Sequence, residues 1–150
     1  MTKPSVVVLV DDDESIRKAI TRSLRFHDIS VEAFSSAEQY LYSECIPEAA
    51  CLILDVMLPG MKGMDLQHRL IENGQHIPII FITAHDDDHV REQALELGAV
   101  AFLRKPFQEQ ELMDAISSAC EAGCARMFAR EGKHSATEPG AVGVNGIEQP

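Results

Sequence analysis

Short apolar segments alternate with longer amphipathic segments along most of the chain, and this alternation constrains the fold more than any other feature. The apolar segments are too short for helices and predict buried strands. They span residues 6–10, 31–34, 51–54, 79–83 and 101–103. The segments between them have helical spacing, as in Ile16, Ile20 and Leu24. Alternating strands and helices predict an α/β fold built on a doubly wound, five-stranded parallel sheet.

Several helix boundaries are marked by residues that satisfy free backbone groups. Asp13 immediately precedes the first helical pattern and is expected to cap it. The pair Ser35-Ser36, followed by Glu38 and Gln39, predicts a capping box at the start of a second helix. Leu97-Gly98 predicts a helix end, because glycine readily adopts the left-handed conformation found there.

The helical and strand patterns fade near Arg126. Residues 126–150 contain four glycines, two prolines and few large apolar side chains. We therefore expect one folded domain over residues 4–125, followed by a flexible tail over residues 126–150. No segment with its own core follows the fifth strand-helix unit, so an appended output domain is expected to be missing.

The charge of the chain restricts its partners. Thirteen lysines and arginines against 24 acidic residues give a net charge of −11, which repels a nucleic-acid backbone. We expect no nucleic-acid binding by this chain alone, and instead a cation such as magnesium or a basic protein partner. No apolar run approaches the roughly 20 residues that span a bilayer. The N-terminus also lacks the apolar region of a secretion signal, so a cytoplasmic location without membrane association is expected.

Cysteines and histidines suggest weaker alternatives for metal binding. Cys51 lies in an apolar run, which favours a buried, reduced thiol. Cys120 and Cys124 would share one helical face, but no second pair of ligands completes a zinc site. His85 and His89 have a spacing that binds metal when both lie on one helical face, although a solvated loop is the commoner outcome.

Polar residues end four of the five predicted strands. In open parallel sheets, ligands bind outside the carboxyl ends of the strands. These residues are Asp11, Asp12 and Asp13 after the first strand, Asp55 after the third, Thr83 after the fourth and Lys105 after the fifth. Crowded carboxylates favour a magnesium site. Asp55 would then act as a nucleophile on a phosphoryl donor, with Lys105 and Thr83 contacting phosphoryl oxygens.

The segment from Leu54 to Gly63, LDVMLPGMKG, accompanies the shorter segments Thr83-Ala84 and Lys105-Pro106-Phe107. In this combination the sequence resembles the receiver domain of bacterial two-component response regulators, over roughly residues 4–118. It is most similar to the receivers of regulators that control transcription. The resemblance implies the flavodoxin-like receiver topology, a phosphoprotein that works in phosphorelay signalling, and a cis peptide bond between Lys105 and Pro106.

The resemblance also implies a role for each polar residue at the strand ends. Asp55 is the phosphoacceptor and Lys105 the lysine that binds the phosphoryl group. Asp11 and Asp12 form the acidic pair that binds Mg²⁺, with Asp12 as the more direct ligand. Asp55 and the backbone carbonyl of Met57 complete the metal ligands.

Signal transmission is implied by the same resemblance. A sensor histidine kinase donates the phosphoryl group, and the added charge shifts a pre-existing equilibrium between two conformations. Thr83, the switch hydroxyl, moves toward the phosphoryl group, and Phe102, the switch aromatic, turns inward. The changed surface acts on a downstream effector protein or a missing output domain, or supports a phosphorylation-dependent homodimer. The chain is expected not to be an enzyme, apart from slow self-dephosphorylation.

Two other functions stay open on the residues alone. A magnesium-dependent phosphatase would use Asp11 as its nucleophile, with Asp13 as a second acid. That function leaves Asp55 and its Pro-Gly loop unexplained. A flavin-binding module would need a Gly, Ser or Thr phosphate loop after the first strand, where the three aspartates would repel phosphate.

Overall fold

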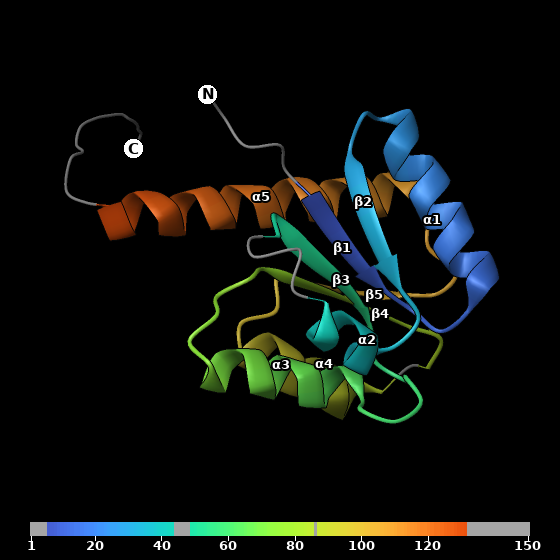
Figure 1. The fold of residues 1–150 in the computed structure, drawn as a ribbon, viewed down its shortest axis with the longest axis horizontal. Helices are drawn as coiled ribbons and strands as arrows, with labels where there is room; N and C mark the ends of the chain where they lie inside the picture. Colours follow the sequence, from blue (N-terminus) through green and yellow to red (C-terminus); the bar gives the residue numbers. More distant parts are fainter. Residues whose placement is uncertain (1–5, 44–48, 86, 132–150) are drawn as a thin grey trace. The chain divides into compact units, whose positions relative to one another are not determined.

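The computed structural model describes residues 6–43, 49–85 and 87–131, with side chains described as far as residue 121. The described residues form a parallel sheet of five strands in the order β2-β1-β3-β4-β5 (Figure 1). The strands are β1 (Val6–Val10), β2 (Ser30–Phe34), β3 (Cys51–Asp55), β4 (Ile79–Thr83) and β5 (Ala101–Arg104). The predicted fold class is confirmed, and each strand lies within a residue of its expected bounds.

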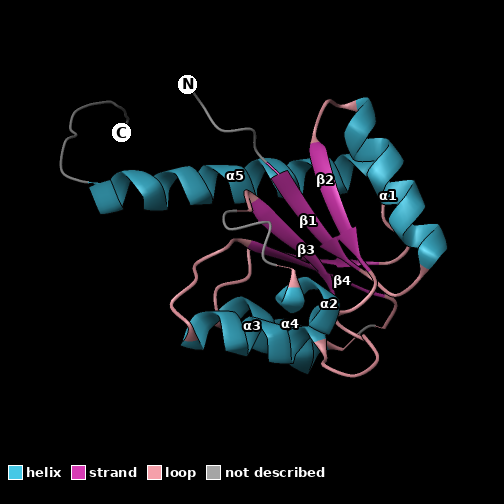
Figure 2. Cartoon of the chain, viewed as in Figure 1, coloured by secondary structure: helices cyan, strands magenta, loops and turns pink. Residues whose placement is uncertain are grey.

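Helices connect the strands and lie on both faces of the sheet (Figure 2). They are α1 (Glu14–Phe26), α2 (Ala37–Tyr42), α3 (Gly63–Glu72), α4 (Asp88–Glu96) and α5 (Glu109–Glu131). The chain divides into two compact units, residues 1–120 and 121–150. The sheet, α1 to α4 and the first part of α5 belong to the first unit. In the second unit the backbone is helical from Glu121 to Glu131. No helix in the described part of the chain combines the length and hydropathy needed to cross a membrane.

Alternation along the strands separates two apolar layers. Val8 and Val10 of β1 pack with α2, α3 and α4, whereas Val7 and Leu9 pack with α1 and the first part of α5. Every residue of β3 and β4 is buried, as expected for central strands covered on both faces. The central strands are therefore rigid supports for whatever residues follow their carboxyl ends.

The predicted helix boundaries can be compared with the observed ones. The Asp13 side chain accepts hydrogen bonds from the backbone N–H groups of Ser15 and Ile16, which confirms the cap of α1. Leu97 is the C-cap residue of α4, and Gly98 follows it with a φ of +106°, which confirms the predicted helix end. Asp87 caps the start of α4.

The capping box at α2 is confirmed in part. Ser36 Oγ accepts a hydrogen bond from the N–H of Gln39, and Gln39 Oε1 in turn accepts one from the N–H of Ser35. The expectation that Glu38 takes part was wrong. Its Oε2 instead accepts a hydrogen bond of 2.8 Å from the N–H of Met61, in the loop between β3 and α3. A tertiary contact has therefore replaced the local one.

Helix α3 begins directly against the end of β3. The N–H of Gly63 donates to the carbonyl oxygen of Val56 at 3.1 Å. A Cβ atom on Gly63 would overlap the backbone carbonyl oxygen of Asp55. Glycine is therefore required here because a helix start approaches the strand end closely, and this contact fixes the course of the chain just after Asp55.

We predict that Gly63→Ala lowers the free energy of unfolding by about 1–3 kcal/mol, because the added methyl group must displace backbone atoms. Denaturant unfolding measures this loss. The control is Gly74→Ala, where nothing lies within 4 Å but φ is +74°. That control should also be destabilised, yet only Gly63→Ala should shift the amide resonances around Asp55. A Gly63→Ala protein as stable as the parent would contradict the close approach.

We also propose residues 4–125 as the folded domain. The last described residues that pack in the core are Ala119 and Cys120, and residues 132–150 lie outside the described part of the chain. A chain truncated after Ala125 should therefore keep nearly the same melting temperature, measured by circular dichroism. A drop of about 5 °C or more would show that later residues stabilise the domain.

Candidate functional site

The carboxyl edge of the sheet brings together polar residues that are far apart in the sequence. Asp11 and Asp12 directly follow β1, Asp55 ends β3, Thr83 ends β4 and Lys105 follows β5. One carboxylate oxygen from each of Asp11, Asp12 and Asp55 lies within 4.8 Å of the other two. The structure thus assembles the predicted site residues at one edge.

Lys105 bridges the carboxylates of two different strand ends. Its Nζ lies 2.9 Å from Asp11 Oδ2 and 3.1 Å from Asp55 Oδ2. The lysine side chain is only 15% exposed, so these contacts are shielded from bulk solvent. The peptide bond that follows, between Lys105 and Pro106, is cis as expected. One ammonium group therefore joins the ends of β1, β3 and β5.

The protonation of the bridge reflects its burial. Burial raises the pKa of the Asp11 carboxyl group, and the charge of Asp55 raises it further, although hydrogen bonds from Asp13 and Lys105 oppose the shift. Burial would lower the pKa of Lys105, but its hydrogen bond to Asp11 and the charges of both aspartates outweigh burial and raise it. Lys105 therefore stays charged. The repulsion between the neighbouring carboxylates is destabilising, and a further cation would reduce it.

Each oxygen of the Asp55 carboxylate faces a different donor. Oδ1 accepts a hydrogen bond of 3.0 Å from the N–H of Met57, and Oδ2 contacts Lys105. The residue is only 4% exposed. Its carboxylate is therefore oriented by the protein and not by solvent. A carboxylate oriented in this way, beside two other acids and a lysine, has the chemistry of a nucleophile.

Thr83 and Phe102 lie on neighbouring strands near this edge. Thr83 is 2% exposed, and its Oγ1 accepts a hydrogen bond of 3.1 Å from the N–H of His85. Its hydroxyl proton is left for another acceptor. Phe102 is half-buried against the layer that contains α4, with its ring centre 6.1 Å from that of Phe81. The switch roles of Thr83 and Phe102 stay predictions.

The structure locates the histidines and cysteines considered as alternative metal ligands. His85 lies in a loop and His89 lies in α4, which begins at Asp88, so the two histidines do not share a helix. Cys51 is a buried free thiol, as expected, and burial raises its pKa to about 12. Cys120 is partly buried against the same apolar layer as Cys51, whereas the side chain of Cys124 lies outside the described residues.

Two further contacts to this edge were not predicted from the sequence. Arg17 Nη1 donates to the backbone carbonyl oxygen of Asp11 at 2.7 Å, so α1 holds the acidic loop that precedes it. Glu38 holds the loop after β3 through Met61, 23 residues away. The contact of Arg17 has a signal in the sequence, because an arginine one turn into α1 is close enough to reach the loop just before the helix. Nothing in the local sequence marks the contact of Glu38.

Known proteins resemble this chain over the same region. The profile of the response regulator receiver domain matches residues 7–117. Nodulation protein W of Bradyrhizobium diazoefficiens is 45% identical over 117 residues, which are 78% of this chain and 52% of the relative. Response regulator protein TodT of Pseudomonas putida is 44% identical over 117 residues, again 78% and 52%. The chain therefore spans about half the length of these curated relatives.

Solved structures agree with the sequence comparison. Response regulator StyR superposes with a TM-score of 0.80 at 40% identity, over 86% of this chain and 65% of that one. FixJ-N superposes with a TM-score of 0.73 at 32% identity, over 80% and 96% of the two chains. The sheet order, the acidic strand ends and these similarities together show that the chain belongs to the response regulator receiver domain family.

Proposed function

We propose that this receiver domain accepts a phosphoryl group on Asp55 from a sensor histidine kinase, in the presence of Mg²⁺, and that phosphorylation changes a protein-interaction surface. One observation carries the proposal. The Asp55 carboxylate is held at the carboxyl edge of the sheet, with Lys105 3.1 Å from Oδ2 and the carboxylates of Asp11 and Asp12 beside it. This set combines a nucleophile with the charges that phosphoryl transfer requires.

The transfer follows from the arrangement of the Asp55 carboxylate. One oxygen of Asp55 attacks phosphorus and forms an O–P bond, while the bond between phosphorus and the phosphohistidine nitrogen of the kinase breaks. The product is an acyl phosphate on Asp55, and the electron pair leaves with the histidine nitrogen. Lys105, already at the carboxylate, supplies positive charge to the transferred oxygens.

The donor set fits a hard divalent cation. Asp11, Asp12 and Asp55 offer carboxylate oxygens within 4.8 Å of one another, and Mg²⁺ is bound mainly by carboxylates, water and phosphate oxygens. We propose these three residues and the backbone carbonyl of Met57 as its ligands. When bound, Mg²⁺ neutralises charge on the phosphoryl oxygens.

The proposed switch uses residues next to the acceptor. Thr83 Oγ1, now bonded to the N–H of His85, would donate its proton to a phosphoryl oxygen. Phe102 would turn further into the space beside Phe81. Both residues adjoin the face built from α4, β5 and α5, so we propose this face as the surface that changes.

The names of the relatives support a proposal for the partners of this surface. We propose that the chain acts in the cytoplasm, on a downstream effector protein or an output domain, and that phosphorylation supports a homodimer. The relatives include proteins named transcriptional regulatory protein, such as FixJ of Azorhizobium caulinodans, of which this chain spans 52%.

The position of Asp13 favours this function over a phosphatase with Asp11 as its nucleophile. Such a phosphatase would use Asp13 as a second acid. The carboxylate of Asp13 instead accepts the N–H groups of Ser15 and Ile16 at the start of α1. Asp11 has no exposed surface, whereas Asp55 keeps 4%, so a phosphoryl donor reaches Asp55 more readily.

We predict that Asp55→Asn abolishes stable phosphorylation by a small phosphodonor such as acetyl phosphate and leaves the protein folded. The amide is nearly isosteric with the carboxylate but is not a nucleophile. Phosphorylation is measured by intact-protein mass spectrometry with and without Mg²⁺, and folding by circular dichroism.

The matched control is Asp13→Asn, which changes an acid of the same edge but keeps a side chain that can cap α1. This control should be phosphorylated like the parent. Labelling of Asp55→Asn at full stoichiometry would place the acceptor on another residue and overturn the proposal.

The lifetime of the phosphorylated state should depend on Met57, a residue that is 48% exposed and lies two residues after Asp55. A thioether neither donates a proton nor acts as a base, so it does not orient an attacking water. We predict that Met57→Asn speeds loss of the phosphoryl group about tenfold, which corresponds to about 1.4 kcal/mol of barrier. Phosphate release at fixed magnesium concentration measures this rate.

Two controls separate water access from other effects on that rate. Met57→Leu keeps an apolar side chain and should stay near the parental rate. Phe102→Ala acts on the proposed switch and should also change the rate little. If Met57→Asn loses phosphate no faster than the parent, water access at Met57 does not limit the lifetime.

A further inference from the structure

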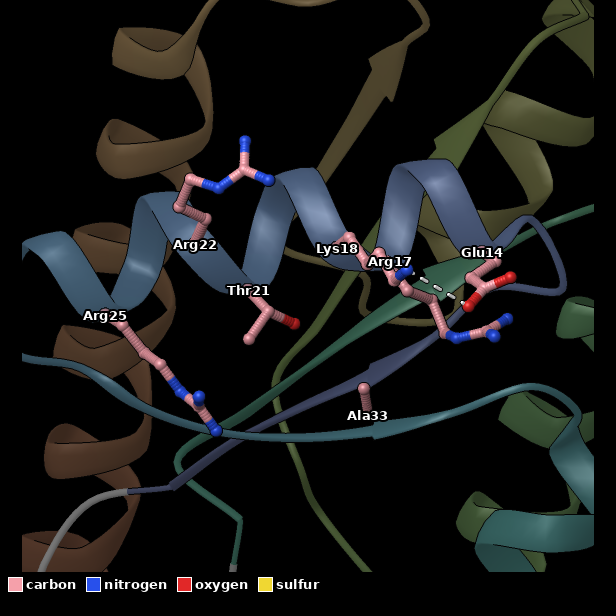
Figure 3. Close-up of a pocket in the computed structure, with 7 residues that line it drawn as sticks. All are labelled: Glu14, Arg17, Lys18, Thr21, Arg22, Arg25 and Ala33. Carbon is pink, nitrogen blue, oxygen red and sulfur yellow. Dashed lines mark ion pairs between the residues drawn. The ribbon is translucent and has the colours of Figure 1, made fainter.

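A groove with a strongly basic wall lies between α1 and the edge strand β2 (Figure 3). Its lining comes from Ala33 of β2 and from six residues of α1, namely Glu14, Arg17, Lys18, Thr21, Arg22 and Arg25. Four of the chain's 13 lysines and arginines are therefore on this one helix, in a protein whose net charge is −11. Neither the proposed phosphoryl transfer nor the proposed switch uses this cluster of charge.

The residues of α1 divide into two groups by direction. Arg17, Thr21 and Arg25 recur at intervals of four residues, so they share one side of the helix. Figure 3 shows these three on the side of α1 that faces Ala33, whereas Arg22 points away from the strand. The two arginines thus stand at either end of the groove, with a hydroxyl group between them.

The positive charge of the groove is only weakly compensated. Lys18 pairs with Glu14 at 3.3 Å, an exposed contact within one helix. Arg17 donates to the carbonyl oxygen of Asp11, a neutral acceptor. Arg22 and Arg25 make no hydrogen bond or ion pair through their side chains with any residue that the structure describes. In the groove, the guanidinium group of Arg25 is therefore free to bind an anion, and Arg17 keeps the N–H donors that Asp11 does not use.

The floor of the groove is a strand edge. Within the described sheet, β2 pairs only with β1, so its outer backbone groups are not used by another strand. Val31 and Ala33 lie on the same face of β2, but Val31 is buried whereas the small Ala33 is exposed. The edge is therefore open near Ala33, and open strand edges can accept an extended segment of another chain.

We propose that this groove docks an extended, acidic segment of a partner protein, which lies along the edge of β2 and pairs its carboxylates with Arg17 and Arg25. The two arginines are separated by about 12 Å along the helix axis, from the rise of about 1.5 Å per residue. Two acidic residues four positions apart in an extended segment are separated by about 13 Å. The spacing of the arginines therefore matches two acids four positions apart, which lie on the same face of a strand.

Charge complementarity also selects the position of such a segment. The net charge of −11 repels carboxylates on average, but interactions beyond about 8 Å are screened at physiological salt, so nearby charges decide where an acidic segment binds. The basic wall of the groove therefore favours such a segment locally. This docking is independent of phosphorylation on Asp55, so it is tested on the unphosphorylated chain without magnesium, and its failure would leave the proposed function untouched.

The test uses a short acetylated and amidated peptide of alternating glutamate and threonine as the probe. Titration into the isotope-labelled full chain should shift amide resonances of α1 and β2, followed by NMR. Arg25→Glu should weaken binding roughly five- to tenfold, because one exposed ion pair is replaced by repulsion. Arg25→Gln, which avoids a new charge in the last turn of α1, should weaken it roughly two- to threefold.

Matched controls define what would overturn the docking proposal. Arg69→Glu reverses an exposed charge in the last turn of α3 and should leave the affinity unchanged, and a glutamine-threonine peptide should not bind. Equal weakening by Arg69→Glu would reduce the effect to net charge and overturn the proposal. Tighter binding of a single-stranded oligonucleotide would assign the groove to nucleic acid instead. Dimerisation of the free chain that Arg25→Glu abolishes would assign it to a second copy.

Discussion

The contact of one lysine with two aspartates is the interaction on which the functional edge depends. Lys105 reaches Asp11 and Asp55 at 2.9 Å and 3.1 Å, and the three residues follow or end three different strands. Without this ammonium group, the two like-charged carboxylates would repel each other strongly, because burial removes the water that would screen their charges. Burial also costs each carboxylate its solvation. The single positive charge of Lys105 does not balance the site, because Asp12 adds a third carboxylate to the cluster. The edge is thus stable enough to form and still favours a cation.

Contacts outside the site hold this edge in shape. Gly63 allows α3 to start against the carbonyl group of Asp55, and Glu38 fastens the loop between them. Arg17 fastens the acidic loop from the other layer of helices. Each contact uses a different helix, so the position of Asp55 depends on packing on both faces of the sheet. Arg17 also lines the basic groove, which places the proposed docking surface next to the acidic loop.

Sequence patterns predict the features of this chain that arise locally. Buried strands produce unbroken apolar runs, and the caps of α1 and α4 need particular side chains beside the helix, so both could be read directly. The convergence of Asp11, Asp55 and Lys105 followed from the rule that parallel strands share a carboxyl edge. The contact of Glu38 with Met61 could not be predicted from the sequence, because Glu38 and Gln39 are both suited to the capping box. Only the folded structure shows that Gln39 fills that role and that Glu38 binds the loop. The groove was not predicted either, because it forms only when α1 packs beside β2 and β2 lies at the edge of the sheet.

The most direct measurement is the chemical position of the phosphoryl group on the parent protein. The chain would be treated with acetyl phosphate and Mg²⁺, the acyl phosphate reduced with borohydride, and the modified aspartate located by peptide mass spectrometry. We expect modification at Asp55, the residue held between Met57 and Lys105, and a loss of modification when Mg²⁺ is chelated. Modification at Asp11 with Asp55 unchanged would contradict it.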